Sequence, residues 1–372
     1  MKIVADKDIF RVAETFSGAG ELLLLPGREI CAEHVHKADA LLVRTVTRVT
    51  RDLVAGSRLR FVGSATSGTD HVDMKALEEL GITFAHASGC NADAVVNYVV
   101  AALAFMANPA RQDWRQLSAG VIGAGNVGGR LGRLFARLGM QVKIFDPLLD
   151  ASHPLAEHFA SLEEVLRQDI VSVHVPLTDV GPFPTRHMLT TSHLGNLKQD
   201  AIFINAARGE VIDNRALASF LAKRADVKAV LDVWENEPAL QASLVGQAAL
   251  ATPHIAGYSL YGKRNGTSAV YKEFCRYFRM TPGDDRENPV VTTIEAGGES
   301  VADSMNRIIL KAYPISGDKL ELTHMTNAEE LSRQFEQRRN GYVFRREFGE
   351  FYVTGEYAAV LGTTLQALGF HV

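Results

Sequence analysis

The chain has 372 residues, more than the usual length of a single domain, so two or three domains with an ample buried core are expected. Its 39 Lys and Arg residues nearly balance 43 Asp and Glu residues, and no basic run is present, which argues against nucleic acid or an anionic membrane surface as a partner. The three cysteines, Cys31, Cys90 and Cys275, are widely separated, a pattern that favours a reducing compartment over a disulfide framework or a metal site.

Residues 1–92 alternate short β-rich runs with helix-like segments. In chain order the runs are KIVAD, ELLLLP, ALLVR, RFVGSAT and ITFAHA. This alternation predicts βαβ units and a mainly parallel sheet. No apolar leader stands before the first run.

Residues 93–107 form an apolar helical pattern that ends at Asn108 and Pro109. We expect this helix to connect two domains, because a second alternating series begins after it. The apolar run is expected to be too short, and too interrupted by Asn97, to span a bilayer. A cytoplasmic protein is therefore predicted.

The second series, within residues 93–256, predicts another parallel sheet with helices. Its strand candidates are AGVI, QVKIFD, DIVSVHVPL, DAIFINAA, VKAVLDVW and ALATPHI, and its helix candidates include SLEEVLRQ and NRALASFLAK. The predicted fold class is therefore α/β, with two doubly wound, Rossmann-like or flavodoxin-like parallel-sheet domains.

The remaining chain predicts a return to the first domain and then a third module. The segment YGKRNGTSAVYKEFCRYFRM reads as a helix that packs back on the first domain, and TPGDDRENP reads as a polar linker. Two helix patterns follow, the second opening with a capping-box-like Thr326-x-x-Glu329, and then two alternating strands, YVFRREF and FYVTG. The predicted domains are residues 1–92 with 257–280, residues 93–256, and a small α+β domain of residues 287–372.

A Gly-x-Gly-x-x-Gly motif, Gly123 to Gly128, lies between the strand candidate AGVI and an apolar-faced helix. In such a turn Gly123 permits the tight bend, Gly125 lets the backbone approach a pyrophosphate, and Gly128 allows close helix–strand packing. The apolar helix positions are Val127, Leu131, Leu134 and Leu138.

The next strand candidate ends in Asp146, at about the 20-residue distance expected of an acid that hydrogen-bonds ribose hydroxyls. A carboxylate there repels a 2′-phosphate, so NAD rather than NADP is the predicted cofactor. The alternative interpretation is a glycine turn in an ordinary α/β domain, followed by an exposed aspartate.

Four charged or titratable residues interrupt apolar strand ends in the second series: Arg208, Asp232, Glu237 and His254. Ligands of doubly wound sheets bind outside the carboxyl ends of the strands, where all four fall. Oxidation of an alcohol beside a carboxylate needs a base, which suits His254 because an imidazole has an ordinary pKa near 6.5. Glu237 would stabilise the imidazolium, and Arg208 would bind the carboxylate and polarise the forming carbonyl.

Each of these residues also has a structural alternative. His254 alone is more often a hydrogen-bonded structural histidine, Arg208 an ion-pair member, and Glu237 before a proline an acid at a helix N-terminus. The combination of the three residues downstream of a dinucleotide motif favours catalysis.

The motifs NAARGEVIDNRALASFL, LDVWENEP, TPHIAGYS and GAGNVG resemble, in order and spacing over residues 1–280, the D-isomer-specific 2-hydroxyacid dehydrogenase family. The resemblance implies two similar α/β domains, a substrate-binding lid and an NAD-binding Rossmann domain. It assigns catalysis to Arg208, Glu237 and His254. The cofactor contacts it implies are Gly123, Gly125, Asn126, Val127, Gly128, Asp146, Val175, Ala206, Ala207, Asp232 and Gly257.

Three further features narrow the resemblance: a short N-terminal domain, Tyr258 with SLYGK after HIAG, and a C-terminal module of under 90 residues. They resemble the branch of the family that oxidises 4-phospho-D-erythronate at C2, using NAD, in pyridoxal phosphate biosynthesis. This resemblance implies that residues 287–372 are a homodimerisation domain. It also implies substrate contacts at Thr45, Thr66 and Tyr258, although both threonines could equally be turn-capping residues.

The phosphate of such a substrate needs a further cation, since Arg208 and His254 serve the reacting end. The candidates are Arg44, Arg345 and Arg346, with a solvated basic pair as the alternative for the last two. Two other functions stay open: oxidation of another 2-hydroxy acid, such as 3-phosphoglycerate or the acids derived from glyoxylate and hydroxypyruvate, and a non-catalytic NAD-sensing role.

Overall fold

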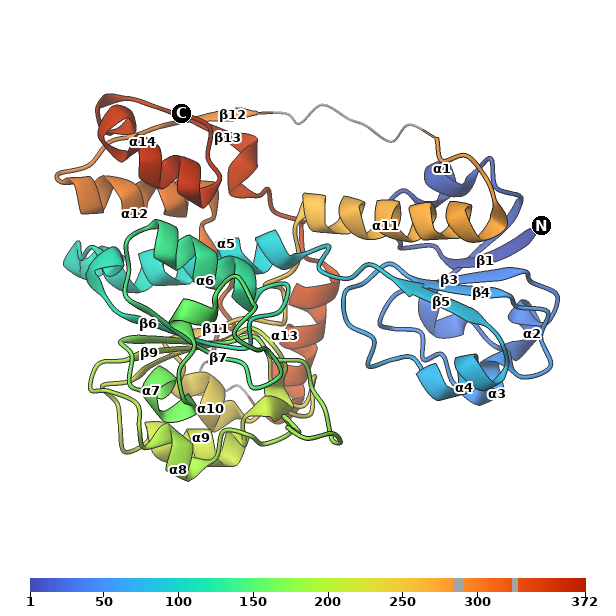
Figure 1. Ribbon diagram of the computed structural model, residues 1–372, viewed down its shortest axis with the longest axis horizontal. Coiled ribbons are helices and arrows are strands. Elements are labelled where there is room, and N and C mark those ends of the chain that lie inside the picture. The colour runs from blue at the N-terminus through green and yellow to red at the C-terminus, as the bar shows by residue number, and fades with distance from the viewer. Residues whose placement is uncertain (284–290, 323–326) are drawn as a thin grey trace. The chain divides into compact units, whose positions relative to one another are not determined.

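The structure, a computed structural model, describes residues 1–283, 291–322 and 327–372 (Figure 1). The chain divides into two compact units. Residues 1–91 and 259–289 make up the first, and residues 92–258 and 290–372 make up the second. The C-terminal residues therefore group with the second sheet, and the helix after residue 258 groups with the first.

The first unit contains a five-stranded parallel sheet, as the alternating pattern predicts. The strand order is β2-β1-β3-β4-β5, with strands β1 (Lys2–Asp6), β2 (Glu21–Leu25), β3 (Ala40–Val43), β4 (Phe61–Ser64) and β5 (Thr83–His86). All neighbouring strands pair in parallel. The helices of this unit are α1 (Val12–Phe16), α2 (Ala32–Val35), α3 (Arg51–Val54), α4 (Met74–Glu79) and α11 (Leu260–Phe278).

Helix α11 packs on the first sheet although it follows the second sheet in sequence. Its Val270, Phe274 and Cys275 are buried in one apolar cluster with residues of the first sheet and of α1. A Cβ at Gly266 would lie 2.6 Å from the carbonyl oxygen of Ala65, so glycine is needed at this contact. The first unit is therefore discontinuous in sequence.

The second unit contains a six-stranded parallel sheet of order β11-β10-β9-β8-β6-β7. The strands are β6 (Ala119–Ile122), β7 (Val142–Phe145), β8 (Ile170–Val173), β9 (Ile202–Asn205), β10 (Lys228–Leu231) and β11 (Leu250–Ala251). Helices α6 (Gly128–Arg137), α7 (Leu162–Leu166), α8 (Thr191–Leu194), α9 (Asn214–Leu221) and α10 (Ala242–Gln247) connect them. The order reverses between β6 and β8, which is where a doubly wound sheet binds its ligand. The predicted α/β fold class is confirmed.

Helix α5 (Ala92–Ala107) is a core helix of the second unit. By length and composition alone, the 19 residues Ala92–Ala110 could cross a membrane, so the expectation that the run is too short is wrong. Of the most apolar window of that helix, 72% is buried inside the structure, as in the core helix of a folded domain. Asn97 is satisfied there, because its side-chain oxygen accepts a hydrogen bond from the backbone N–H of Phe348 (2.8 Å).

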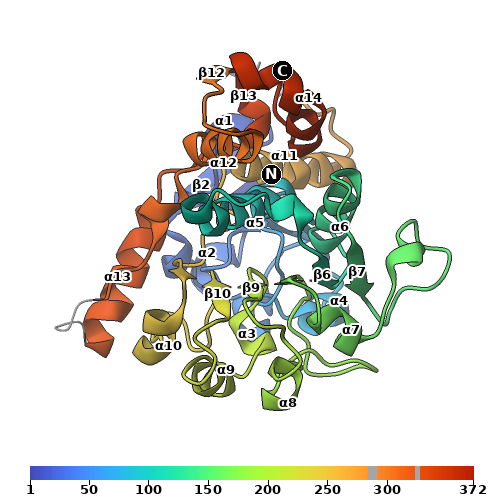
Figure 2. The same ribbon diagram turned by 90° about the vertical axis from the view of Figure 1, so that its left-hand side faces the viewer.

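The C-terminal residues share their core with α5 and the second sheet. Strand β12 (Thr292–Glu295) pairs in parallel with β13 (Phe351–Thr354), and the helices are α12 (Val301–Ala312), α13 (Ala328–Asn340) and α14 (Glu356–Leu368). Helix α12 lies along α5 in Figures 1 and 2, and its Met305, Ile308 and Ile309 are fully buried in the cluster that contains the apolar side of α5.

Three details of the C-terminal prediction differ from the structure. The segment YVFRREF is not a strand, because it runs as irregular chain that turns Arg345 inward, as described below. Helix α14 was not predicted from the sequence. Helix α13 is capped by Asn327, whose side chain accepts a hydrogen bond from the N–H of Glu330 (2.8 Å), whereas Thr326 and most of the predicted linker lie outside the described residues.

Candidate active site

The glycine loop after β6 has the geometry of a dinucleotide-binding turn. Gly123 has a φ of +89°, and a Cβ there would lie 2.8 Å from the carbonyl oxygen of His174, at the end of β8. A Cβ at Gly128 would lie 1.8 Å from the carbonyl oxygen of Gly123, so only glycine lets α6 begin this close to the turn. Gly125 and Asn126 are exposed at the tip, and among the described residues other than its chain neighbours nothing lies within 4 Å of a Cβ at Gly125. The residues present therefore fit a pyrophosphate at the N-terminus of α6.

Asp146 directly follows β7 and faces this loop. Its Oδ2 accepts a hydrogen bond from the N–H of Ala124 (2.8 Å), and its Oδ1 accepts one from the N–H of Leu148 (3.1 Å). The carboxylate is half-buried and held beside the loop that would receive the pyrophosphate. This is the position expected of an acid that contacts the adenosine ribose.

Arg208 lies in the turn that follows β9. Asn205 shapes this turn, because its side chain donates to the carbonyl of Arg208 (3.1 Å) and accepts from the N–H of Ala207 (3.1 Å). A Cβ at Gly209 would lie 1.9 Å from the carbonyl carbon of Trp234, so glycine lets this turn contact the segment that leads to Glu237. The other predicted cofactor residues occupy strand ends of the same sheet: Val175 follows β8, Ala206 and Ala207 follow β9, and Gly257 lies in the loop after β11.

Glu237 and His254 form a hydrogen-bonded pair. Nδ1 of His254 lies 2.7 Å from Oε2 of Glu237, and the side chains are 29% and 17% exposed. The second oxygen of Glu237 accepts a hydrogen bond from the N–H of Trp234 (3.0 Å). His254 has a left-handed backbone with a φ of 56°, uncommon for a residue other than glycine, and its N–H donates to the carbonyl of Asp232 (2.7 Å).

The pKa of Glu237 is lowered, although the carboxyl is largely buried. Burial is the largest influence and acts to raise the pKa, but His254, the nearby Arg339 and the Trp234 N–H together outweigh it. Glu237 therefore stays ionised near neutral pH and orients the imidazole, leaving Nε2 as the atom that can exchange a proton with a substrate.

Asp232 organises the loop that carries His254. The carboxylate is 1% exposed and accepts hydrogen bonds from the Thr252 hydroxyl (2.6 Å) and from the N–H groups of Ile255 (2.8 Å) and Ala256 (2.9 Å). This structural role was missed in the sequence, where Asp232 was predicted only as a cofactor contact. Its contact with the cofactor stays a prediction.

Arg345 holds the same loop from the C-terminal side. Its guanidinium donates to the carbonyl oxygens of Ile255 (2.9 Å), Tyr258 (3.0 Å) and Ala256. It also donates to the carbonyl oxygen of Ala94 in α5 (2.9 Å) and lies 4.3 Å from the ring centre of Tyr313. Both terminal nitrogens of Arg345 thus donate to backbone carbonyls, an arrangement that gives this arginine a structural role and does not favour the prediction that it binds a substrate phosphate.

Tyr258 is also contacted by the C-terminal residues. Its ring packs edge to face on Tyr342 (6.0 Å between centres) and Phe344 (6.1 Å). A second arginine lies at the end of α13: Nη1 of Arg339 is 3.7 Å from Oε2 of Glu237, and Tyr258 and Glu237 are among the groups that raise the pKa of this arginine. Sequence analysis missed Arg339, and the only signal was a pair of arginines in the last turn of a predicted helix.

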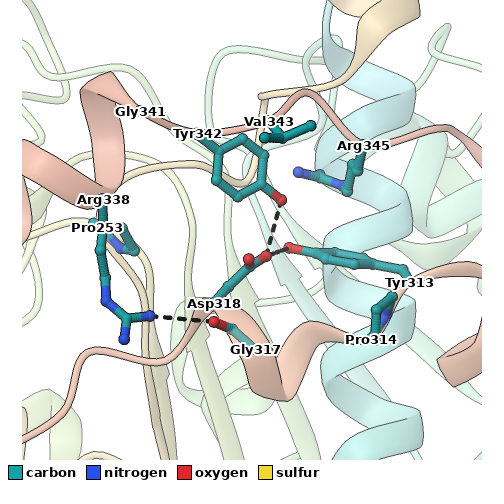
Figure 3. A pocket seen from close by; sticks show the side chains of 10 residues that line it. All are labelled: Pro253, Tyr313, Pro314, Gly317, Asp318, Arg338, Gly341, Tyr342, Val343 and Arg345. Carbon is teal, nitrogen blue, oxygen red and sulfur yellow. Dashed lines mark hydrogen bonds between the residues drawn. The ribbon is translucent and has the colours of Figure 1, made fainter.

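A cavity of about 380 Å³ lies behind the histidine loop, between Pro253 and the C-terminal residues. Figure 3 shows the hydroxyls of Tyr313 and Tyr342 pointing at Asp318, to which they donate (2.7 and 2.9 Å). Burial is the main cause that raises the pKa of Asp318. This network braces the chain on which Arg345 lies.

The predicted substrate residues of the first unit have their own partners. Arg44 pairs with Asp6 (2.8 Å) and Asp8 (2.8 Å). The hydroxyl of Thr66 lies 2.8 Å from that of Ser64, and Thr45 is exposed at the end of β3.

Arg346, in the second unit, hydrogen-bonds the Thr292 hydroxyl. Among the described residues, no group of three or more His, Cys, Asp and Glu side chains could hold a metal ion.

Comparison with known proteins identifies the class. Residues 99–256 match the model of the D-isomer specific 2-hydroxyacid dehydrogenase, NAD binding domain. The NAD⁺-bound 3-phosphoglycerate dehydrogenase of Entamoeba histolytica has the same fold, with a TM-score of 0.63 and 22% identity over 75% of this chain and 95% of that one. The fold and the site thus define an NAD-dependent dehydrogenase of the D-2-hydroxyacid class.

Two curated relatives match nearly the whole chain. The erythronate-4-phosphate dehydrogenase of Marinobacter nauticus is 43% identical over 93% of each chain, and that of Teredinibacter turnerae is 41% identical over 100% of this chain and 98% of its own. The chain belongs to the erythronate-4-phosphate dehydrogenase family.

Proposed function

We propose that the protein oxidises 4-phospho-D-erythronate at C2 to 2-oxo-3-hydroxy-4-phosphobutanoate in the biosynthesis of pyridoxal 5′-phosphate, vitamin B6. The observation that carries this proposal is the similarity to erythronate-4-phosphate dehydrogenases, which extends beyond the two sheets into the C-terminal residues. The hydrogen-bonded Glu237–His254 pair supports a proton-transfer step.

Each catalytic residue has a role that its surroundings support. His254 takes the proton of the C2 hydroxyl on Nε2, while Glu237 accepts the hydrogen bond from Nδ1–H and stabilises the imidazolium. Arg208 binds the substrate carboxylate and polarises the forming carbonyl. NAD held at the glycine loop from Gly123 to Gly128 would supply the hydride acceptor. Thr45, Thr66 and Tyr258 are proposed to contact the substrate, and Arg44 or Arg346 its phosphate.

The substrate is tested by comparing kcat/KM for 4-phospho-D-erythronate and 3-phosphoglycerate with NAD, and for glyoxylate and hydroxypyruvate with NADH. We expect the four-carbon phosphorylated acid to be preferred by far. Comparable values for another acid would contradict the substrate, and a lack of turnover with all of them would favour the NAD-sensing role. The same assay on Arg44→Ala and Arg346→Ala tests the phosphate contacts. The variant that has lost such a contact should show a weaker preference for the phosphorylated substrate.

The preference for NAD over NADP is expected to depend on Asp146. Asp146→Ala should lower the ratio of kcat/KM for NAD to that for NADP by about 10- to 100-fold, because the variant loses charge-assisted ribose hydrogen bonds and the repulsion of a 2′-phosphate. Steady-state kinetics with both cofactors measures this ratio. Equal turnover of the unmodified protein with NAD and NADP would show that Asp146 does not select the cofactor.

We also propose that the protein is a cytoplasmic homodimer that associates through its C-terminal residues. Two large apolar side chains of residues 290–372, Tyr352 (43% exposed) and Val291 (47%), line one surface hollow. Another, Val360 on α14, is 69% exposed. Exposed apolar surface of this kind is typical of a subunit interface.

Light scattering should give a mass near twice 40.6 kDa for the full chain at micromolar concentration. Tyr352→Arg should shift the mass toward the monomer, whereas Val180→Arg, at an 83% exposed position in the loop between β8 and α8, should not. A chain cut at Met280 is a poor test, because it would expose the core that α5 shares with α12. A monomeric full-length protein would contradict the proposal.

A further inference from the structure

We propose that Arg339, on the C-terminal helix α13, is a positioning residue of the active site that keeps the Glu237–His254 pair in the charge state needed for proton abstraction. The inference rests on the proposed function only in assigning proton transfer to that pair. It makes residues 327–372 part of the catalytic apparatus, in addition to their proposed part in dimerisation.

The contacts of Arg339 converge on the pair. Its Nη1 is 3.7 Å from Oε2 of Glu237, the same oxygen that lies 2.7 Å from Nδ1 of His254. Tyr258, four residues after the histidine, also acts on this side chain, because it is one of the groups that raise the pKa of Arg339. The guanidinium lies 5.9 Å from the ring centre of Phe335, one turn earlier on the helix, which fixes its direction.

Arg339 is charged and only partly screened by solvent. Its side chain is 26% exposed. Burial acts to lower the pKa of Arg339, but Tyr258, Glu237 and Asp232 outweigh it, so the pKa is raised. The order of charges is thus cation, carboxylate, imidazole, with the carboxylate in the middle.

This order has a definite consequence for the imidazole. Glu237 attracts a proton onto His254, whereas Arg339 repels one, because a protonated imidazole would be a second cation beside the first. The charged and titratable groups for which the structure shows a link to the pair or to the histidine loop are Asp232 after β10, Tyr258 in that loop and Arg339 on α13. Arg339 approaches from the C-terminal side, so removing it leaves the other groups in place.

The test is the pH at which kcat/KM falls to half its plateau on the acid side, called here the acid limb. In Arg339→Met the protonated imidazole loses a repulsive neighbour and persists to higher pH, so the acid limb should rise by about half to one pH unit. Arg339→Lys keeps the charge and should restore the wild-type limb. Glu237→Gln removes the attracting carboxylate and should move the limb in the opposite direction.

Arg333→Met is the matched control, since Arg333 lies on the same helix, is 64% exposed and pairs with Glu330. It should leave the acid limb unchanged. NAD titration and thermal unfolding of each variant establish that it is folded, and Arg339→Gln replaces the Met variant if that one is not.

An acid limb of Arg339→Met within about 0.2 unit of wild type would overturn the inference. So would equal shifts in the Met and Lys variants, because shape rather than charge would then be responsible. Failure of the proposed substrate is a separate outcome. If 4-phospho-D-erythronate is not turned over, the acid limb is measured with a 2-hydroxy acid that the enzyme does turn over.

Discussion

His254→Ala is expected to lower kcat by about 10²- to 10⁴-fold, the usual cost of removing a general base. The imidazole is held by Glu237 on Nδ1, and the backbone N–H of His254 donates to the carbonyl of Asp232, so Nε2 is the atom available to the substrate. NAD binding should survive, because the glycine loop and Asp146 lie on other strands of the sheet. Steady-state kinetics and a fluorescence titration with NAD measure the two effects.

His193→Ala is the control for this experiment. That imidazole caps the short helix α8 through Thr190 and has no contact with Glu237 in the described hydrogen bonds. It should turn over within a factor of about two of the wild type, since surface substitutions of this kind act weakly on the fold. Near-normal turnover of His254→Ala would show that His254 is not the general base, and would favour the alternative of a hydrogen-bonded structural histidine.

Arg345→Met is expected to destabilise the second unit by about 3 kcal/mol, because a buried polar group left without its hydrogen-bond partner costs about 1–3 kcal/mol and several carbonyls are affected. Four backbone carbonyls, those of Ala94, Ile255, Ala256 and Tyr258, would lose their donor. Because three of them belong to the loop after His254, the folded fraction should also lose turnover. Arg345→Lys, which keeps the charge but has fewer donors, should have a stability between those of the wild type and Arg345→Met.

Urea denaturation followed by tryptophan fluorescence measures this change, since both tryptophans, Trp114 and Trp234, belong to the second unit. Arg333→Met on α13 is the comparison, because Arg333 is 64% exposed and pairs with Glu330, which is 42% exposed, a type of pair worth about 0–1 kcal/mol. If the Arg345 and Arg333 variants unfold at the same urea concentration, the Arg345 guanidinium does not support the loop.

Local patterns in the sequence were enough to predict the two sheets and the residues proposed for the core of the site. Parallel strands buried on both faces read as short apolar runs, and a dinucleotide turn requires glycines at fixed spacing before a helix, so both signals lie within a few dozen residues. Arg208, Glu237 and His254 were predicted as candidates for the same reason, because each interrupts an apolar strand end. The structure brings Glu237 and His254 together, and the role of Arg208 stays a prediction.

Tertiary structure alone decided how the C-terminal residues serve the site. In sequence, Arg339, Arg345 and Arg346 are three arginines of one basic stretch, yet the first approaches Glu237, the second is buried on loop carbonyls and the third bonds Thr292. The strand prediction for YVFRREF failed on the same ground, since a period of two cannot reveal that a cation turns inward. Such contacts join residues about 90 positions apart, and their strength comes from burial and backbone geometry that exist only after folding.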